Sequence, residues 1–182
     1  VWLEDEDFDI LKRHGVTVAC CPASNLKLAS GYANVPKMLE SGINVALGTD
    51  GAASNNNLNI MQDMYLFGVV YKGYFRDPTI ITPAEVLHAA TRAGALSQGR
   101  GDSGLLAVGM RADLCVLNTD TPQFTPMTSA ACNVVYAAQG ADIRMTMVDG
   151  EVLYRDGEFK TIDIEKVKAE VQRRTDSILS RL

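Results

Sequence analysis

An aspartate stands at the end of a short apolar run, within Gly48-Thr49-Asp50-Gly51. The run before it, residues 43–47, is predicted to be a buried strand, and parallel α/β folds bind ligands beyond the carboxyl ends of such strands. A carboxylate in that place can bind a metal ion or accept a proton. An aspartate that only caps a turn fits the same spacing, and spacing alone favours that simpler interpretation.

Polar side chains follow two predicted strands. Ser24-Asn25-Leu26-Lys27 comes after the first strand, and Ser54-Asn55-Asn56-Asn57 comes shortly after Asp50. Amides and hydroxyls beside a carboxylate could bind a polar heterocycle, so Asn25, Ser54 and Asn55 are the candidate substrate-binding residues. Ordinary turns use the same residue types, and on the residues alone that simpler interpretation is favoured.

The elements that would position these residues form an α/β pattern. Strands are predicted at 16–21 and 43–47, polar loops at 24–31 and 51–57, and helices at 4–14, 35–40, 58–72 and 82–96. The last of these helices begins with a capping box, Thr82-Pro83-Ala84-Glu85. Continuous apolar strands that alternate with helices are typical of a parallel sheet built from βα units.

The character of the sequence changes after Gly104. Strands are predicted at 112–117, 143–148 and 151–154, and Asp149-Gly150 is a strong hairpin signal. An amphipathic helix is predicted at the carboxyl end, with its apolar residues at helical spacing: Ile164, Val167, Val171, Ile178 and Leu182. The predicted organisation is therefore 1–103 as α/β material, 104–160 as antiparallel β material, and 161–182 as a terminal helix.

Composition excludes several classes of function. The net charge is −5, from 17 basic and 22 acidic residues, with no basic tract, so nucleic-acid binding is not expected. No apolar run approaches the roughly 20 residues that span a bilayer. The four cysteines do not form a disulfide framework, which indicates a reducing, cytoplasmic environment. The chain opens on Val1-Trp2-Leu3 without an initiator methionine, as a segment of a longer protein would.

Two long motifs resemble the amidohydrolase superfamily. They are Val18-Ala19-Cys20-Cys21-Pro22-Ala23-Ser24-Asn25-Leu26-Lys27-Leu28-Ala29-Ser30-Gly31 and Asn44-Val45-Ala46-Leu47-Gly48-Thr49-Asp50-Gly51-Ala52-Ala53-Ser54-Asn55-Asn56-Asn57. The branch they resemble most contains S-adenosylhomocysteine and methylthioadenosine deaminases and the triazine chlorohydrolases. Residues 104–114 and Asp149-Gly150 look like this family's segment into its β-sandwich domain and its sandwich hairpin.

The resemblance implies an α/β fold, namely the last two βα units of a (β/α)8 TIM-like barrel plus part of a small β-sandwich domain. In such enzymes the aspartate that ends the eighth strand, which Asp50 matches, ligates a zinc or iron ion and takes the proton of the attacking water. The implied reaction is hydrolytic deamination of an adenosine-like or other N-heterocyclic small molecule. One divalent metal ion is implied in the complete protein.

The ligand set departs from the family pattern. Relatives use a His-x-His, two further histidines and a glutamate from earlier strands, whereas this chain has only His14 and His88, and neither matches a family ligand. A catalytic zinc has about three protein ligands. The chain should therefore hold the metal weakly and depend on the missing N-terminal half of the barrel as its partner. Cys20 also stands where relatives often carry histidine.

Two other hypotheses remain open on the sequence. A truncated or decayed homologue would be a non-catalytic interaction module, and the open strand edges of a partial barrel predict self-association into a homo-oligomer. The second is a complete α/β binding domain in which Asp50 only caps a turn.

Overall fold

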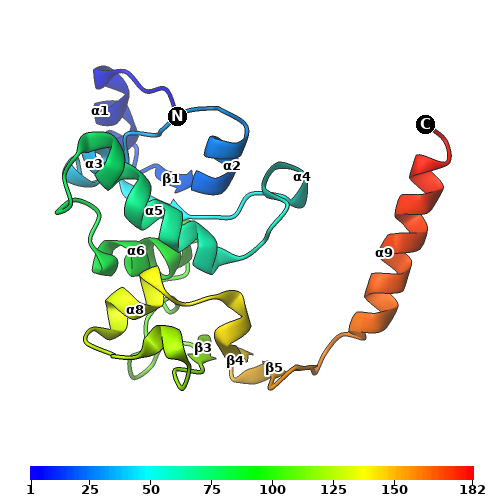
Figure 1. Cartoon of the computed structure of the whole chain (residues 1–182). Coiled ribbons are helices and arrows are strands. Elements are labelled where there is room, and N and C mark those ends of the chain that lie inside the picture. The colour runs from blue at the N-terminus through cyan, green and yellow to red at the C-terminus, as the bar shows by residue number, and fades with distance from the viewer. The chain divides into compact units, whose positions relative to one another are not determined.

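The computed structural model describes all 182 residues, which divide into two compact units (Figure 1). The first unit contains residues 1–110 and 118–142, and the second contains residues 111–117 and 143–182. The first unit carries Asp50 and all of the other candidate site residues. None of the helices is both long enough and apolar enough to cross a membrane. The domain boundaries predicted after residues 103 and 160 remain predictions.

Two parallel strands form the sheet of the first unit. Strand β1 (Thr17–Cys20) pairs with β2 (Asn44–Leu47), so that Val18 faces Val45 and Cys20 faces Leu47 in register. The Asn44 amide fixes the amino end of the pair, because its Nδ2 donates to Thr17 Oγ1 at 2.9 Å and to the Ala93 carbonyl at 3.0 Å. The parallel βα pattern predicted from the sequence is confirmed. The sheet has two strands and is not a closed barrel.

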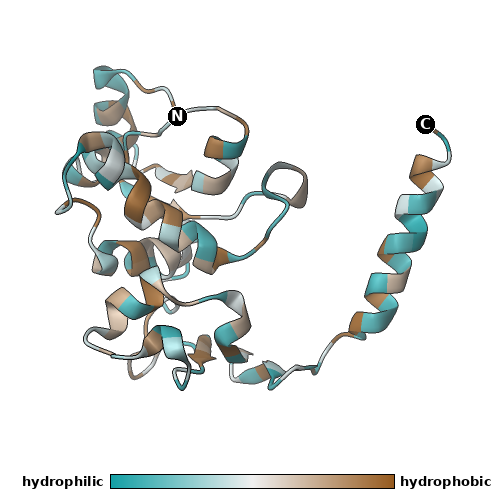
Figure 2. Ribbon diagram, viewed as in Figure 1, coloured by the Kyte–Doolittle hydropathy of each residue, from teal (hydrophilic) through white to brown (hydrophobic).

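The rest of the first unit is mainly helical. Its helices are α1 (Asp5–Arg13), α2 (Pro22–Lys27), α3 (Val35–Glu40), α4 (Ala52–Asn55), α5 (Ile60–Phe75), α6 (Pro83–Ala90), α7 (Arg92–Ser97) and α8 (Ala130–Tyr136), with short 3-10 turns at Pro122–Phe124 and Gly140–Asp142. Of these, α3, α5, α6 and α7 pack against β2. The ribbon of α5 is largely apolar (Figure 2). Its Phe67 and Tyr71 are buried with Val45 of β2, Val86 of α6 and Val135 of α8 in the core. Burial of these side chains supplies most of the driving force for folding.

The two polar loops predicted after the strands are wrong as loops, because each contains a short helix. Pro22 occupies the first helical position of α2, where its fixed φ suits a helix and its missing N–H costs nothing. Helix α4 begins after Gly51 and ends at Asn56, whose φ of 67° is left-handed. These helices present polar side chains in a fixed direction, as loops would not.

Two other sequence predictions are corrected in the same unit. The single helix predicted at 82–96 is two helices, because Thr91 leaves helical geometry with φ −130° and ψ −84°. Helix α8 was not predicted, although its N-cap, Ser129, accepts a hydrogen bond from the backbone N–H of Cys132 at 3.3 Å. The capping box of Thr82 and Glu85 is confirmed.

The second unit is built on one antiparallel sheet, in the order β3-β4-β5-β6. Its strands are β3 (Leu114–Leu117), β4 (Ile143–Val148), β5 (Glu151–Arg155) and β6 (Glu158–Phe159). The predicted hairpin is present, since Asp149 and Gly150 have φ values of 52° and 82°, as a type I′ turn requires. The terminal helix α9 (Ile164–Leu179) carries apolar residues among polar ones and buries none of them (Figure 2).

Gly104 offers a test of the packing in the first unit. Its φ is +84°, and an added Cβ would lie 2.8 Å from Arg92 Cα and 3.0 Å from the Thr91 carbonyl oxygen. We expect Gly104→Ala to lower the free energy of unfolding by about 3 kcal/mol, because backbone must move. Gly99→Ala is the control: φ is +71° but the space is open, so the loss should be about 1 kcal/mol. Urea unfolding measures both, and equal losses would contradict the steric argument.

Candidate functional site

Asp50 lies just beyond the carboxyl end of β2 and is exposed to solvent. Its φ of 61° is left-handed, a conformation that few residues other than glycine, asparagine and aspartate adopt readily. One carboxylate oxygen, Oδ1, accepts a hydrogen bond from the Gly51 backbone N–H at 2.8 Å. The carboxylate therefore lies exposed beyond the end of β2, at the place predicted from the sequence.

Hydroxyl groups from both segments that follow the strands surround this carboxylate. Hydrogen bonding from the Ser54 hydroxyl, then from the Gly51 N–H, then from the Ser24 hydroxyl lowers the pKa of Asp50 below its usual value. The Ser54 hydroxyl also lies 3.0 Å from the Gly51 carbonyl oxygen. The Ser24 hydroxyl is buried and has no partner at ordinary hydrogen-bond distance, so its contribution is the weakest of the three. Asp50 is consequently ionised at neutral pH.

A buried polar network connects the same two segments behind Asp50. The Asn55 amide donates to the Thr49 carbonyl at 2.7 Å and to Asp63 Oδ2 at 3.1 Å. Asp63 Oδ1 accepts a hydrogen bond from the backbone N–H of Ala23 at 3.1 Å. The network therefore joins the start of α2, the end of α4 and the first turn of α5. At the surface, Lys27 also hydrogen-bonds Asn56.

The side chains of the two adjacent cysteines, Cys20 and Cys21, lie in different surroundings. Cys20 is buried, and its Sγ lies 3.3 Å from the hydroxyl of Tyr71 in α5. Cys21 is half-buried near Asp50, and burial followed by the Asp50 charge raises its thiol pKa. Cys20 therefore contacts the helix layer rather than Asp50, although it stands where the family resemblance suggested histidine.

The predicted substrate-binding residues have three different environments. Ser54 is half-buried beside Asp50, and Asn25 is half-buried in α2 with no hydrogen bond from its side chain. Asn55 is buried, and its amide nitrogen is occupied by Thr49 and Asp63. Binding of substrate by these residues stays a prediction. Asp63 was missed by the sequence analysis, and its only signal was a charge within an otherwise apolar helical stripe.

The metal-ligating groups of this chain do not make a complete metal site. No cluster of three or more histidine, cysteine or acidic side chains is present. His14 caps the end of α1 and His88 lies in α6, and both are exposed. Asp50 is an oxygen ligand suited to zinc or iron, but a catalytic zinc needs about three protein ligands. The chain therefore offers one of the ligands that such a site needs.

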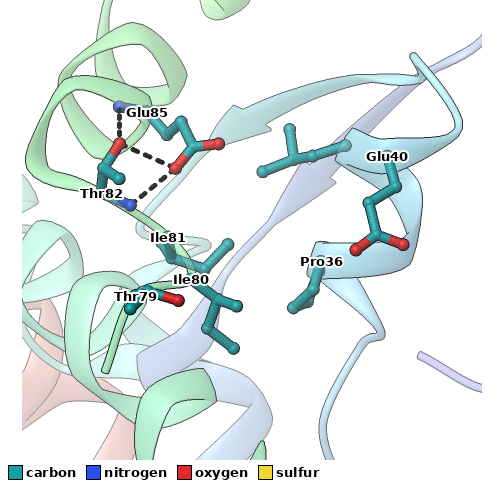
Figure 3. A pocket seen from close by; sticks show the side chains of 8 residues that line it. Pro36, Glu40, Thr79, Ile80, Ile81, Thr82 and Glu85 are labelled. Atoms are coloured by element: carbon teal, nitrogen blue, oxygen red, sulfur yellow. Dashed lines mark hydrogen bonds between the residues drawn. The ribbon is translucent and has the colours of Figure 1, made fainter. Parts of the chain in front are cut away.

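A separate hollow lies between α3 and the segment that leads into α6 (Figure 3). It encloses about 280 Å³ and is lined on one side by Pro36 and Glu40 and on the other by Ile80, Ile81 and Glu85. The Glu85 carboxylate is held by the N–H and hydroxyl of Thr82 in the capping box. None of the residues around Asp50 lines this hollow.

Comparison with known proteins gives a family match over most of the chain. The model of the amidohydrolase family matches residues 1–153. A 5'-deoxyadenosine deaminase from Methanosarcina mazei is 41% identical over all of this chain. A 5-methylthioadenosine/S-adenosylhomocysteine deaminase from Acetivibrio thermocellus is 44% identical over 98% of it. The chain spans 42% of the length of each of these two relatives.

The similar solved structures include a deaminase, as the sequence relatives do, and they match nearly all of this chain. An adenosine deaminase from Xanthomonas campestris with bound zinc matches 98% of this chain at 30% identity and a TM-score of 0.94, over 41% of its own length. A zinc complex of atrazine chlorohydrolase from Arthrobacter aurescens matches 95% of this chain at 26% identity and a TM-score of 0.87, over 39% of its own length. Both proteins are larger than this chain and hold zinc.

The Ser54 hydroxyl provides a test of the electrostatics at Asp50. In Ser54→Ala we expect the pKa of Asp50 to rise toward its ordinary value, because the largest hydrogen-bonding cause of its lowering is removed. A carbon-detected NMR titration of the metal-free chain measures this. Asp77 is an internal control, since Thr79 lowers its pKa in the same way and is untouched. An unchanged Asp50 pKa would contradict the assignment.

Zinc titration tests the incompleteness of the metal site. We expect the 182-residue chain to bind zinc several orders of magnitude more weakly than a complete site does, because Asp50 is a single ligand. Isothermal titration calorimetry measures the affinity, with Asp50→Asn as the comparison. Stoichiometric, tight zinc that is lost in Asp50→Asn would show that ligands within the chain had been overlooked.

Proposed function

Because the chain belongs to the amidohydrolase family, we propose that it is the carboxyl-terminal part of a metal-dependent hydrolase that deaminates an adenosine-like or related N-heterocyclic substrate. The observation that carries the proposal is Asp50, ionised and exposed beyond the end of β2 in a chain that is 41% and 44% identical to deaminases. In this proposal β1 and β2 are the seventh and eighth strands of a (β/α)8 barrel. Polypeptide outside this chain supplies the other strands.

The open edges of the sheet support this architecture. A (β/α)8 barrel closes through eight parallel strands, whereas β1 and β2 each pair on one side only. Unpaired strand edges favour association with further strands. The same argument applies to the second unit, whose four strands would form one layer of a composite β-sandwich. The unpaired edges also favour a homo-oligomer.

The chemistry assigned to this chain is proton transfer at Asp50. In hydrolytic deamination a water oxygen adds to the ring carbon that bears the amino group, one water proton goes to the adjacent ring nitrogen, and the other leaves with the amino group as ammonia while the carbonyl forms. A divalent zinc or iron ion, when bound, supplies acidification of water at that position. Asp50 would be one oxygen ligand and would accept the proton of the water, then return it toward the departing nitrogen. Its lowered pKa keeps the carboxylate in the ionised form that this role needs.

The surroundings of Asp50 provide the remaining parts of the proposal. Ser54 of α4 is a half-buried polar group beside the carboxylate, and Asn25 is a half-buried amide in α2, the helix that follows β1; both suit hydrogen bonding to a purine or ribose. The fold alone hosts several hydrolytic reactions, so the substrate class rests on the relatives rather than on the architecture. Deamination is preferred to dechlorination because the relatives at 41% and 44% identity are deaminases.

Asp50→Asn tests this function. The protein from the complete reading frame, loaded with zinc, should release ammonia from 5'-deoxyadenosine, methylthioadenosine or S-adenosylhomocysteine. We expect Asp50→Asn to lower kcat/KM by roughly 1000-fold or more, because both a ligand and the proton acceptor are lost. Ammonia release is measured with a coupled assay. The matched control is Asp77→Asn, an exposed carboxylate with a lowered pKa away from the site.

Two results would contradict the proposal. One is a zinc-loaded wild-type protein that releases no ammonia from any of the three nucleosides. The other is a fully active Asp50→Asn variant. The first result would favour a non-catalytic interaction module, and analytical ultracentrifugation would then measure its self-association.

A further inference from the structure

Asp63 is a buried carboxylate on a face of α5 that is otherwise apolar. It lies in the first turn of α5 and has 0% of its surface exposed. Its neighbours along the same helix, Met61, Met64 and Phe67, are buried apolar side chains. Removal of a carboxylate from water costs several kcal/mol unless hydrogen bonds compensate, so the hydrogen-bond partners of Asp63 decide whether it can be buried here.

Both oxygens of Asp63 accept hydrogen bonds from outside α5. Oδ1 accepts from the backbone N–H of Ala23 at 3.1 Å, and Oδ2 accepts from the Asn55 amide at 3.1 Å. Acceptance at both oxygens is the behaviour of an ionised carboxylate, and the amino end of α5 favours that charge. Burial disfavours the charged form and raises the pKa of Asp63, while the hydrogen bonds from Ala23 and Asn55 lower the pKa in part.

The donors belong to the two segments that surround Asp50. Ala23 precedes Ser24, whose buried hydroxyl faces Asp50, and Asn55 follows Ser54. The Asn55 amide also holds the Thr49 carbonyl at 2.7 Å, directly before the left-handed turn at Asp50. One buried carboxylate therefore connects the segments that follow β1 and β2, the same two segments that contribute the neighbours of Asp50.

From these contacts we propose that Asp63 is a positioning residue, which orients Asp50 by binding Ala23 and, through Asn55, Thr49. This inference rests on the proposed function for its catalytic consequence but not for its structural one. Asp63 does not touch Asp50 and takes no part in the chemical step. Its loss should therefore leave substrate binding largely intact and impair the step in which Asp50 acts.

The chain provides a closely matched control for this role. Asp142 is also buried, at 7% exposure, and accepts one backbone N–H, from Gln139 at 2.8 Å, and one side-chain amide, from Gln123 at 2.9 Å. It has the same donor types as Asp63 but lies in the 3-10 turn Gly140–Asp142, and its carboxylate hydrogen-bonds Gln123 and Gln139 rather than the segments around Asp50. Asp142→Asn should destabilise the fold to a similar extent without touching the site.

The first experiment compares Asp63→Asn and Asp142→Asn in the zinc-loaded protein from the complete reading frame. The asparagine keeps the size of the side chain but places an NH₂ against a donor, so one of the two bonds to Asp63 is lost. We expect Asp63→Asn to lower kcat per bound zinc by about 10- to 100-fold with KM within about 3-fold. Asp142→Asn should leave kcat per bound zinc within about 2-fold of wild type.

The second experiment does not depend on activity. Hydrogen–deuterium exchange of the same proteins reports opening of the backbone in residues 22–30 and 48–56. We expect exchange on the order of 10-fold faster in both segments in Asp63→Asn, because one hydrogen bond is lost and the bond that remains is no longer made to a charged group. Asp142→Asn should leave both segments at the wild-type rate.

The results separate the two proposals. If wild type has no deaminase activity, the proposed function fails, and faster exchange in both segments still supports the link through Asp63. If wild type is active but Asp63→Asn matches Asp142→Asn in kcat and in exchange, Asp63 has only a packing role and the inference is overturned.

Should Asp63→Asn not fold, Asn55→Ala breaks the link to Thr49 with Asp63 retained. That variant must then show the same fall in kcat and faster exchange in residues 48–56, and wild-type values there would overturn the inference.

Discussion

The exclusion of one charge from water determines how the first unit is organised around Asp50. The Asp63 carboxylate can stay buried only while N–H groups are directed at it, and α5 itself offers it no side-chain donor. The donors therefore come from the segments that follow β1 and β2, which must approach α5 together. A parallel pair of strands places those segments at the same edge, and the short helices α2 and α4 present the Ala23 N–H and the Asn55 amide in fixed directions. Secondary structure, burial and the position of Asp50 thus depend on one another.

The sequence predicted the parts of this arrangement that depend on local pattern. The apolar runs of β1 and β2, the capping box at Thr82 and the hairpin at Asp149-Gly150 are each defined by neighbouring residues, and each is present. Asp50 was found because it directly follows a strand. Asp63 could not be found in this way, because its partner Ala23 is 40 residues away and contributes a backbone N–H, a group that every residue but proline carries.

Other differences between expectation and structure have local causes. Short helices were mistaken for loops after both strands, since serine and asparagine are common in turns and a helix of one turn has no detectable periodicity. The break at Thr91 has no glycine or proline to mark it. Metal binding is a different case, because the histidine and glutamate ligands that the family resemblance calls for have no counterparts in these 182 residues, and only the aspartate has one, Asp50.

The left-handed backbone at Asp50 restricts what evolution can place there. Branched and bulky residues are strained at a φ of 61°, so most substitutions would disturb the turn as well as remove the carboxylate. Asparagine is the exception, because it tolerates this backbone and matches the shape of aspartate. Under the proposed function, an exchange of Asp50 for asparagine would therefore remove the chemistry and keep the fold. A homologue with asparagine at this position would be expected to keep the fold and to lack the catalytic activity.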